Sequence, residues 1–457
     1  MAAFLDLCRF IPTLGGTTDF VYSAAVGGCQ GPAAAGAQNG IKYKLYAVSN
    51  DLTQWELFEG TYNSSTGTFP RTIVLANSNG TGVSVGQTGA GTKIAFSTVP
   101  QVSVVGVAED LISLEVPNGF SAAQQAQARG NLYASPLDAL AFNGMQYNGS
   151  VEASQINGTT AVAVSTGAQV LYFADGWQVV KSGTSVLSAQ QVAVADLPGF
   201  TFAARLSVTT AQAAIGTDYV AFRHAIEGSR FARAAWGASG AVPISAGMWV
   251  CLPMAGTYQA TILNAAQTVS AAASFTVTTA NVWQYVTMTF AAQTTGVWAT
   301  DNTVGADLRI YLDLAGQTGH AVANTSYVCR VTGLVVLPGV ELPSAARSPF
   351  IMRPLSLELA QCQRYVTILG GGSATDLIIQ GYINGAGQAI TLPFALPVRM
   401  RAVPAASLVG TQALSNTSGA GYFPSPGSLT IQVIALAAGT VTWQVSAGSY
   451  VLLDARM

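Results

Sequence analysis

The residues of this chain best suited to chemistry are aromatic and charged side chains in two segments with strand-like alternation. Trp283 and Tyr285 lie in one segment, and Arg309, Tyr311 and Asp313 lie in the other. Because successive side chains of a strand point to opposite faces, all five are expected opposite the apolar, core-facing positions. Aromatic rings stack on the C–H faces of sugars, and planar charged groups bond their hydroxyls. We therefore predict these five residues as a glycan-binding cluster. The alternative is that the aromatic residues belong to the core or to subunit contacts.

Residues that could support catalysis are scarce, and the chain has only two histidines. His224 falls on the apolar face of a strand and is expected in the core. His320 lies in a loop rich in Gly and Thr, with no Cys, Asp or Glu at metal-ligand spacing. Glycan hydrolysis needs a pair of carboxylates, but Asp301 begins a turn and Asp313 shares its strand face with Arg309. We predict that the protein is not an enzyme and uses no cofactor and no metal ion.

The composition predicts a β-rich protein that associates with other subunits. Half of the residues are hydrophobic and only 9% are charged, against roughly 25% in typical soluble domains. Between Arg401 and Asp454 there is no Asp, Glu, Lys, Arg or His, and a surface of low charge favours association. A net charge of −2 gives no electrostatic basis for binding nucleic acid. No apolar run is long and continuous enough to predict membrane insertion.

The five cysteines are far apart in the sequence and match no metal-binding motif. We expect them to be buried free thiols in a protein that is made in a reducing cytoplasm.

Two-residue alternation recurs along the chain and predicts antiparallel strands. In residues 308–314, leucine and isoleucine alternate with polar residues, and residues 41–48 and 219–227 follow the same pattern. The dipeptides at 384–385 (Asn-Gly) and 438–439 (Ala-Gly) are expected to be hairpin turns. The fold class is therefore all-β, with several β-sandwich or jelly-roll domains in series and one short helical linker.

We predict four regions along the chain. Residues 1–112 form an N-terminal β domain, and residues 113–149 form a linker whose short helix begins at Ser121. Residues 150–343 form a jelly-roll sandwich, and residues 344–457 form a C-terminal β domain.

The most specific motif lies at the entry to the last region. The segment "ELAQCQRY" at residues 358–365, followed by "PVRMRAVP" at residues 397–404, resembles the C-terminal domain of tailed-bacteriophage fibre proteins. Its charges, Glu358, Arg364, Arg399 and Arg401, are the last before the neutral region, so we expect them at a domain or subunit junction. "LSLELAQCQ" has Leu355, Leu359 and Cys362 at near-helical spacing; we expect a helix there and a buried Cys362.

Two other regions carry weaker resemblances. The segments "NVWQYVTMTF" and "LRIYLDL" resemble carbohydrate-binding jelly-roll modules, and residues 1–112 resemble a small N-terminal domain of phage fibre and decoration proteins. Together these resemblances imply a bacteriophage virion structural protein. It would be a homotrimeric tail fibre or receptor-binding spike on the exterior of the tail or head, made in the cytoplasm of the bacterial host. Its partners would be other virion proteins, through the N-terminal domain, and host cell-surface polysaccharide. The alternatives are a head fibre or capsid-decoration protein and a glycan depolymerase.

Overall fold

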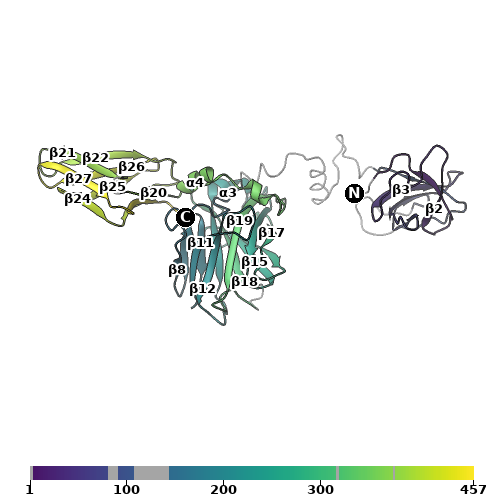
Figure 1. Ribbon diagram of the computed structural model, residues 1–457, viewed down its shortest axis with the longest axis horizontal. Coiled ribbons are helices and arrows are strands. Elements are labelled where there is room, and N and C mark those ends of the chain that lie inside the picture. Colours follow the sequence, from purple (N-terminus) through teal and green to yellow (C-terminus); the bar gives the residue numbers. More distant parts are fainter. Residues whose placement is uncertain (1–3, 81–90, 108–143, 315–318, 374–375) are drawn as a thin grey trace. The chain divides into compact units, whose positions relative to one another are not determined.

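The computed structural model describes residues 4–80, 91–107, 144–314, 319–373 and 376–457. It forms two compact units, Met1–Ala128 and Arg129–Met457. Most of its elements are antiparallel strands (Figure 1), and this confirms the predicted all-β class. The predicted helix that begins at Ser121 lies outside the described residues. No helix in these described segments is long and apolar enough to span a bilayer.

The first unit is built on a seven-stranded antiparallel sheet with the order β5-β2-β1-β7-β3-β4-β6. Its core is rich in aromatic rings, and Phe69 packs against the rings of Phe10 and Tyr62. The strands are β1 (Arg9–Pro12), β2 (Phe20–Ala25), β3 (Lys42–Val48), β4 (Trp55–Thr61), β5 (Thr68–Phe69), β6 (Ile73–Asn77) and β7 (Gln101–Val104).

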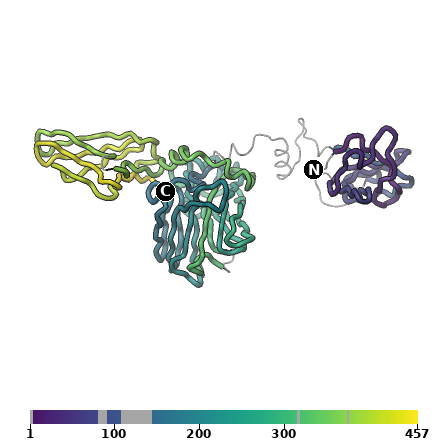
Figure 2. The backbone as a smooth tube through the Cα atoms, viewed as in Figure 1, coloured from purple at the N-terminus to yellow at the C-terminus, as the bar shows by residue number. Residues whose placement is uncertain are grey.

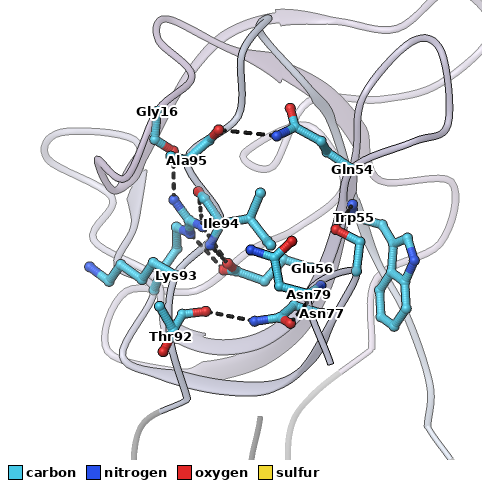
Figure 3. A network of polar contacts seen from close by, with 12 residues as sticks. Gly16, Gln54, Trp55, Glu56, Asn77, Asn79, Thr92, Lys93, Ile94 and Ala95 are labelled. Atoms are coloured by element: carbon cyan, nitrogen blue, oxygen red, sulfur yellow. Dashed lines mark hydrogen bonds and ion pairs between the residues drawn. The ribbon is translucent and has the colours of Figure 1, made fainter. Parts of the chain in front are cut away.

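A buried ion pair joins β4 to segments of this unit that have little strand pairing. The side chains of Glu56 and Arg71 are both 0% exposed, and Arg71 Nε lies 2.6 Å from Glu56 Oε1. The backbone N–H of Ile94 donates to Glu56 at 2.7 Å (Figure 3), while Arg71 donates to the carbonyls of Ile94 and Gly16. The Arg71 guanidinium also lies 4.8 Å from the centroid of the Phe20 ring. A pair this deeply buried needs all of these partners, because unpaired buried charge is costly.

The second unit contains a sandwich of two six-stranded sheets (Figure 2). One sheet has the order β16-β15-β18-β13-β10-β9 and is called the β18 sheet here; the other, with the order β17-β14-β19-β12-β11-β8, is called the β19 sheet. The strands are β8 (Val162–Val164), β9 (Gln169–Ala174), β10 (Trp177–Lys181), β11 (Val186–Ala193), β12 (Phe202–Thr210), β13 (Val220–Glu227), β14 (Ile244–Cys251), β15 (Gly256–Leu263), β16 (Ser270–Val277), β17 (Gln284–Phe290), β18 (Val304–Leu314) and β19 (Val328–Pro338).

The apolar positions of these strands fill the space between the two sheets. On β18 the inward residues Leu308, Ile310 and Leu312 are at most 1% exposed, as the alternation predicts. His224 is also fully buried, against the rings of Trp177 and Tyr147. Burial lowers the pKa of His224 to about 3, so it is a neutral core residue, as predicted.

Short helices follow some of these strands and lead into the last region of the chain. They are α3 (Gly228–Phe231), the 3-10 turns η2 (Ala232–Ala234) and η3 (Ser348–Ile351), and α4 (Leu355–Gln363). Helix α4 confirms the predicted helix of the "ELAQCQRY" segment, and Cys362 is 0% exposed.

The C-terminal region packs three three-stranded sheets, with the orders β20-β28-β23, β21-β27-β24 and β22-β26-β25. The two predicted hairpins are wrong, because their dipeptides join strands of different sheets. Most successive strands here belong to different sheets, and their apolar side chains share a core that includes Trp443 and Val433. The strands are β20 (Val366–Gly370), β21 (Ile378–Ile383), β22 (Ala389–Ala395), β23 (Ala405–Val409), β24 (Gln412–Ser415), β25 (Thr417–Pro424), β26 (Ser428–Ala435), β27 (Gly439–Val445) and β28 (Tyr450–Asp454).

Charged residues of the "ELAQCQRY" segment attach this region to the sandwich. Glu227 at the end of β13 accepts hydrogen bonds from Arg364 Nε at 2.9 Å and from the Tyr365 hydroxyl at 2.8 Å. Burial alone would raise the pKa of Glu227, but the hydrogen bonds from Arg364, Tyr365 and Ser229 lower it. Glu358 accepts from the backbone N–H of Asn148 at 2.7 Å.

A second contact across this junction comes from the strand-entry motif "PVRMRAVP". Arg401 Nη1 donates to the Asn302 carbonyl at 2.6 Å, and the Asn302 side chain donates back to the Arg401 carbonyl. The structure therefore places Glu358, Arg364 and Arg401 in contact with residues before the C-terminal region, whereas Arg399 is exposed.

Candidate binding faces of the sandwich

The five residues predicted as one glycan-binding cluster lie on two different sheets. Trp283 immediately precedes β17 and Tyr285 lies in it, in the β19 sheet. Arg309, Tyr311 and Asp313 lie in β18, in the other sheet. The prediction of a single cluster is therefore wrong. Alternation along a strand fixes which face a side chain occupies, but consecutive strands of a sandwich can belong to opposite layers.

The outer face of the β18 sheet carries two arginines held by one carboxylate. Arg223 on β13 and Arg309 on β18 are direct cross-strand partners. Asp307 lies between their guanidinium groups, with Oδ1 2.9 Å from Arg223 Nε and Oδ2 2.9 Å from Arg309 Nη2. Like charges directly opposite one another are destabilising, so Asp307 is the residue that allows this pair. Burial alone would lower the pKa of Arg309, but its hydrogen bond and charge interaction with Asp307 raise it.

Two tyrosines and a threonine lie beside these arginines. Tyr219 and Tyr311 are half-buried, and their rings meet edge to face with centroids 6.1 Å apart. Thr261 on β15 is the cross-strand partner of Arg309. Its hydroxyl is buried and has no hydrogen-bond partner among the described residues. Buried polar atoms are rarely left unpaired, so this hydroxyl is an exception beside the arginines. We call Arg223, Asp307, Arg309, Tyr219 and Tyr311 the arginine–tyrosine face.

The last residues of the chain bound this face on the side of β9 and β10. Gln178 accepts a hydrogen bond from Arg223 and donates to the Met457 carbonyl at 3.1 Å. The Tyr172 hydroxyl donates to the same carbonyl, and the Arg456 guanidinium lies 4.5 Å from the centroid of the Tyr172 ring. A ligand would therefore meet the face over β13, β18 and β15.

Asp313, also on β18, differs from Arg309 in its contacts and not in its exposure, since it is 6% exposed and Arg309 is 7% exposed. Its Oδ2 accepts a hydrogen bond from the Val220 backbone N–H at 3.2 Å. Burial raises the pKa of Asp313 to about 7. The structure gives this residue a structural role at the end of the strand.

The other two predicted residues lie on the outer face of the β19 sheet. The Trp283 ring lies 4.8 Å from the Arg330 guanidinium carbon. Tyr285 packs on Trp249 at 5.6 Å between ring centroids, and its hydroxyl is buried close to Gly247. Burial raises the pKa of Tyr285. Tyr285 therefore fits the alternative of a packed aromatic residue. Trp283 instead packs its ring against the Arg330 guanidinium.

The first unit also has a depression, of about 510 Å³, at the edge of its sheet. It is lined by short neutral groups such as Asn39, Thr61 and Asn63, with Tyr62 as its one titratable side chain. The lining of this depression offers neither a charged group nor a nucleophile paired with a base.

Three residues of the arginine–tyrosine face were absent from the predicted cluster. The alternation of residues 219–227 already placed Tyr219 and Arg223 opposite the apolar positions, so a signal for these two was present. Asp307 lies two residues before Arg309 on the same strand, so alternation alone puts these two on one face. What joins Arg223 to them is the register between β13 and β18, which no local pattern specifies.

No protein-family model and no curated protein matches this chain. Among solved structures, the enzymatically active domain of bacteriophage CBA120 tailspike protein 4 matches with a TM-score of 0.26 at 11% identity. The match covers 43% of this chain and 22% of the tailspike chain, so this chain spans about a fifth of its length. The family 11 carbohydrate-binding module of the Clostridium thermocellum cellulase Lic26A-Cel5E matches with a TM-score of 0.23 at 11% identity, over 40% of this chain and all of the module. The CBM22-1 and GH10 modules of C. thermocellum xylanase 10B match with a TM-score of 0.23 at 14% identity, over 40% and 30% of the two chains. These likenesses are too distant to assign a function to this chain.

Proposed function

We propose that this chain is a structural protein of a tailed-bacteriophage virion, a tail fibre or receptor-binding spike whose sandwich binds a host surface glycan. The observation that carries the proposal is the arginine–tyrosine face. It places two guanidinium groups and two half-buried rings on one side of the β18 sheet, with Arg223, Tyr219 and Tyr311 partly exposed and Arg309 7% exposed beneath them. The resemblance of the "ELAQCQRY" segment to phage fibre domains supports the virion role. This segment forms α4 and contacts the sandwich through the bond from Arg364 to Glu227.

The chemistry of this face suits a ligand rich in hydroxyls. Asp307 fixes the planes of both guanidinium groups, so their remaining N–H groups are preorganised donors. The rings of Tyr219 and Tyr311 can stack on the C–H faces of a sugar ring.

The same geometry favours binding over cleavage. Asp307 is already paired with two arginines, and Asp313 is engaged by a backbone N–H below the surface. Glycoside hydrolysis uses two carboxyl groups that flank the scissile bond, about 5–10 Å apart. Neither aspartate of β18 is free for that role.

Each site on such a surface would be weak, and the strength of attachment would come from its repetition. In a homotrimer the three copies present three faces, and several fibres multiply them. Linked weak sites gain avidity through effective concentration, by about 10²–10⁴ over a single site. The N-terminal unit would attach the protein to the virus particle. The near absence of charge in the C-terminal region favours contacts between subunits.

The test of the site is glycan binding by the purified full chain. Replacing Tyr219 and Tyr311 together by Ala should weaken binding roughly 5- to 150-fold, since each aromatic contact contributes about 0.5–1.5 kcal/mol. Tyr382→Ala is the matched control, because Tyr382 is 72% exposed and lies in the C-terminal region. Unchanged binding in the double variant would remove this face as the site.

Two further measurements separate the alternatives. A reconstruction of the particle that places the chain on the head would favour a head fibre or decoration protein. The appearance of shorter oligosaccharides after incubation with host polysaccharide would favour a depolymerase.

A further inference from the structure

The outer face of the β19 sheet holds a second pair of opposed arginines, which the proposed function does not use. Arg205 on β12 and Arg330 on β19 are direct cross-strand partners, and Arg330 is in turn the partner of Cys251 on β14. Side chains of such partners lie on the same face of the sheet, so two guanidinium groups come together here. This arrangement is unfavourable without negative charge to offset it.

Arg330 has its compensating charge and is held rigidly. Its two Nη atoms lie 3.0 and 2.7 Å from the two carboxylate oxygens of Asp196. The Trp283 ring packs against the guanidinium, and Cys251 Sγ lies 3.3 Å from Nη2. Hydrogen bonding to Arg330 lowers the pKa of Asp196, so this pair is charged at neutral pH.

Arg205 differs, because its side chain forms a single hydrogen bond with the described residues, from Nε to the Ser207 hydroxyl at 3.0 Å. Within the part of the chain that the structure describes, no carboxylate forms an ion pair with it. With Arg330 matched by Asp196, the face therefore carries one uncompensated positive charge. On the arginine–tyrosine face, by contrast, a single carboxylate lies between both guanidinium groups.

The two arginines open onto a cleft of about 320 Å³, which is at the lower end of the size of small-molecule sites. Asn281 stands at its rim with a left-handed backbone, φ 59°, fixed by a hydrogen bond from its N–H to the Leu252 carbonyl at 2.7 Å. Its side-chain amide adds a polar group to the charged end of the cleft. The other lining residues are Val192, Ala193, Cys251 and Val328.

We propose that this cleft binds an oxyanion (a carboxylate, phosphate or sulfate group) between Arg205 and Arg330. The planar fork of arginine matches such groups with two parallel hydrogen bonds. An anion here would neutralise the excess charge and relieve the repulsion between the opposed arginines. The group could come from an acidic sugar of a polysaccharide or from free inorganic phosphate. The site does not depend on the arginine–tyrosine face, which belongs to the other sheet.

Calorimetric titration of the full chain tests the proposal, with ionic strength held constant by chloride. Sodium phosphate, sodium sulfate, sodium glucuronate and an oligosaccharide of glucuronate are the probes, and glucose is the uncharged comparison. The Arg205→Gln variant should lose at least about tenfold in affinity for the anions, which corresponds to about 1.4 kcal/mol. Arg399→Gln is the control for a change of net charge, because Arg399 is exposed in the C-terminal region.

The outcomes are distinct. Binding of phosphate and glucuronate alike, lost in Arg205→Gln and kept in Arg399→Gln, supports an oxyanion site open to either source. Binding of the acidic oligosaccharide alone, with the same dependence on Arg205, identifies an acidic glycan as the source. Binding of no anion, or equal losses in the two variants, overturns the proposal. The Tyr219→Ala, Tyr311→Ala double variant should keep its anion binding, so failure of the glycan face and failure of this cleft can be told apart. Unchanged thermal unfolding of Arg205→Gln confirms that its fold is intact.

Discussion

Replacing Arg71 by Met should strongly destabilise the first unit. The change removes the ion pair with Glu56 and the hydrogen bond from Arg71 to the buried Ile94 carbonyl, while the Gly16 carbonyl keeps the Phe96 N–H as a donor. The Glu56 carboxylate would stay buried with only the Ile94 N–H bonded to it. Removing one partner of a buried ion pair costs about 3–5 kcal/mol, because the other charge is left uncompensated.

This cost is large compared with the roughly 5–15 kcal/mol by which a domain is stable. For a unit of this size, each kcal/mol lowers the unfolding midpoint by roughly 4–8 °C, so the midpoint should fall by about 12–40 °C. Scanning calorimetry of the full chain measures the shift. Hydrogen exchange locates it, since peptides from residues 4–80 and 91–107 should exchange faster while peptides from residues 144–457 keep their protection.

The double variant Glu56→Leu, Arg71→Met isolates the cause. It removes the uncompensated carboxylate, so it should be more stable than Arg71→Met alone. Lys93→Met is the control, because Lys93 pairs with Asp19 at the surface and such pairs contribute at most about 1 kcal/mol. A cost below about 1 kcal/mol for Arg71→Met, or simple additivity in the double variant, would refute this reasoning.

Three other predictions concern the second unit. Glu227→Gln weakens the hydrogen bonds between residue 227 and Arg364, so hydrogen exchange in α4 should become faster while exchange in β12 stays unchanged. Unchanged exchange in α4 would contradict this role of Glu227. Asp313 has its pKa raised to about 7 in the fold, so the native state holds more protons than the unfolded state between about pH 4 and 7, and stability falls as pH rises. Asp313→Asn should therefore stabilise the chain by about 2–4 kcal/mol at pH 8 and by nothing near pH 4, as measured by urea unfolding; an equal effect at both values would exclude titration of Asp313 as the cause. Trp443→Ala removes a fully buried ring from the C-terminal core and should cost about 3–5 kcal/mol by calorimetry; a cost near zero would mean that this core is not packed around the ring.

Local patterns in the sequence predicted the character of single elements well. Alternation separated the inward Leu308 and Ile310 from the outward Arg309 and Tyr311. The near-helical spacing of Leu355 and later residues predicted α4. These successes share one cause, because the period of a strand or helix is a property of a few consecutive residues.

Predictions that needed distant partners were the ones that failed. The chain bends at or beside both dipeptides, but β21 pairs with β27 and β22 with β26, so neither dipeptide closes a hairpin. Trp283 and Arg309 both point away from the core by strand alternation, yet they occupy opposite sheets. Asp313 has the strand parity of Arg309, but its carboxylate accepts a hydrogen bond from a backbone N–H of the neighbouring strand.

The sequence by itself determined that the chain is all-β, which side chains of a strand avoid the core, and which charges precede the neutral C-terminal region. The tertiary structure decided which of those side chains meet. Asp307 joins Arg223 to Arg309 only because β13 and β18 pair in one register, and Arg205 faces Arg330 only because β12 lies beside β19. Strand pairing brings together residues that are tens to more than a hundred positions apart. It is selected by burial of the whole apolar face rather than by any local motif, so a binding face assembled across strands is visible only once the sheets have formed.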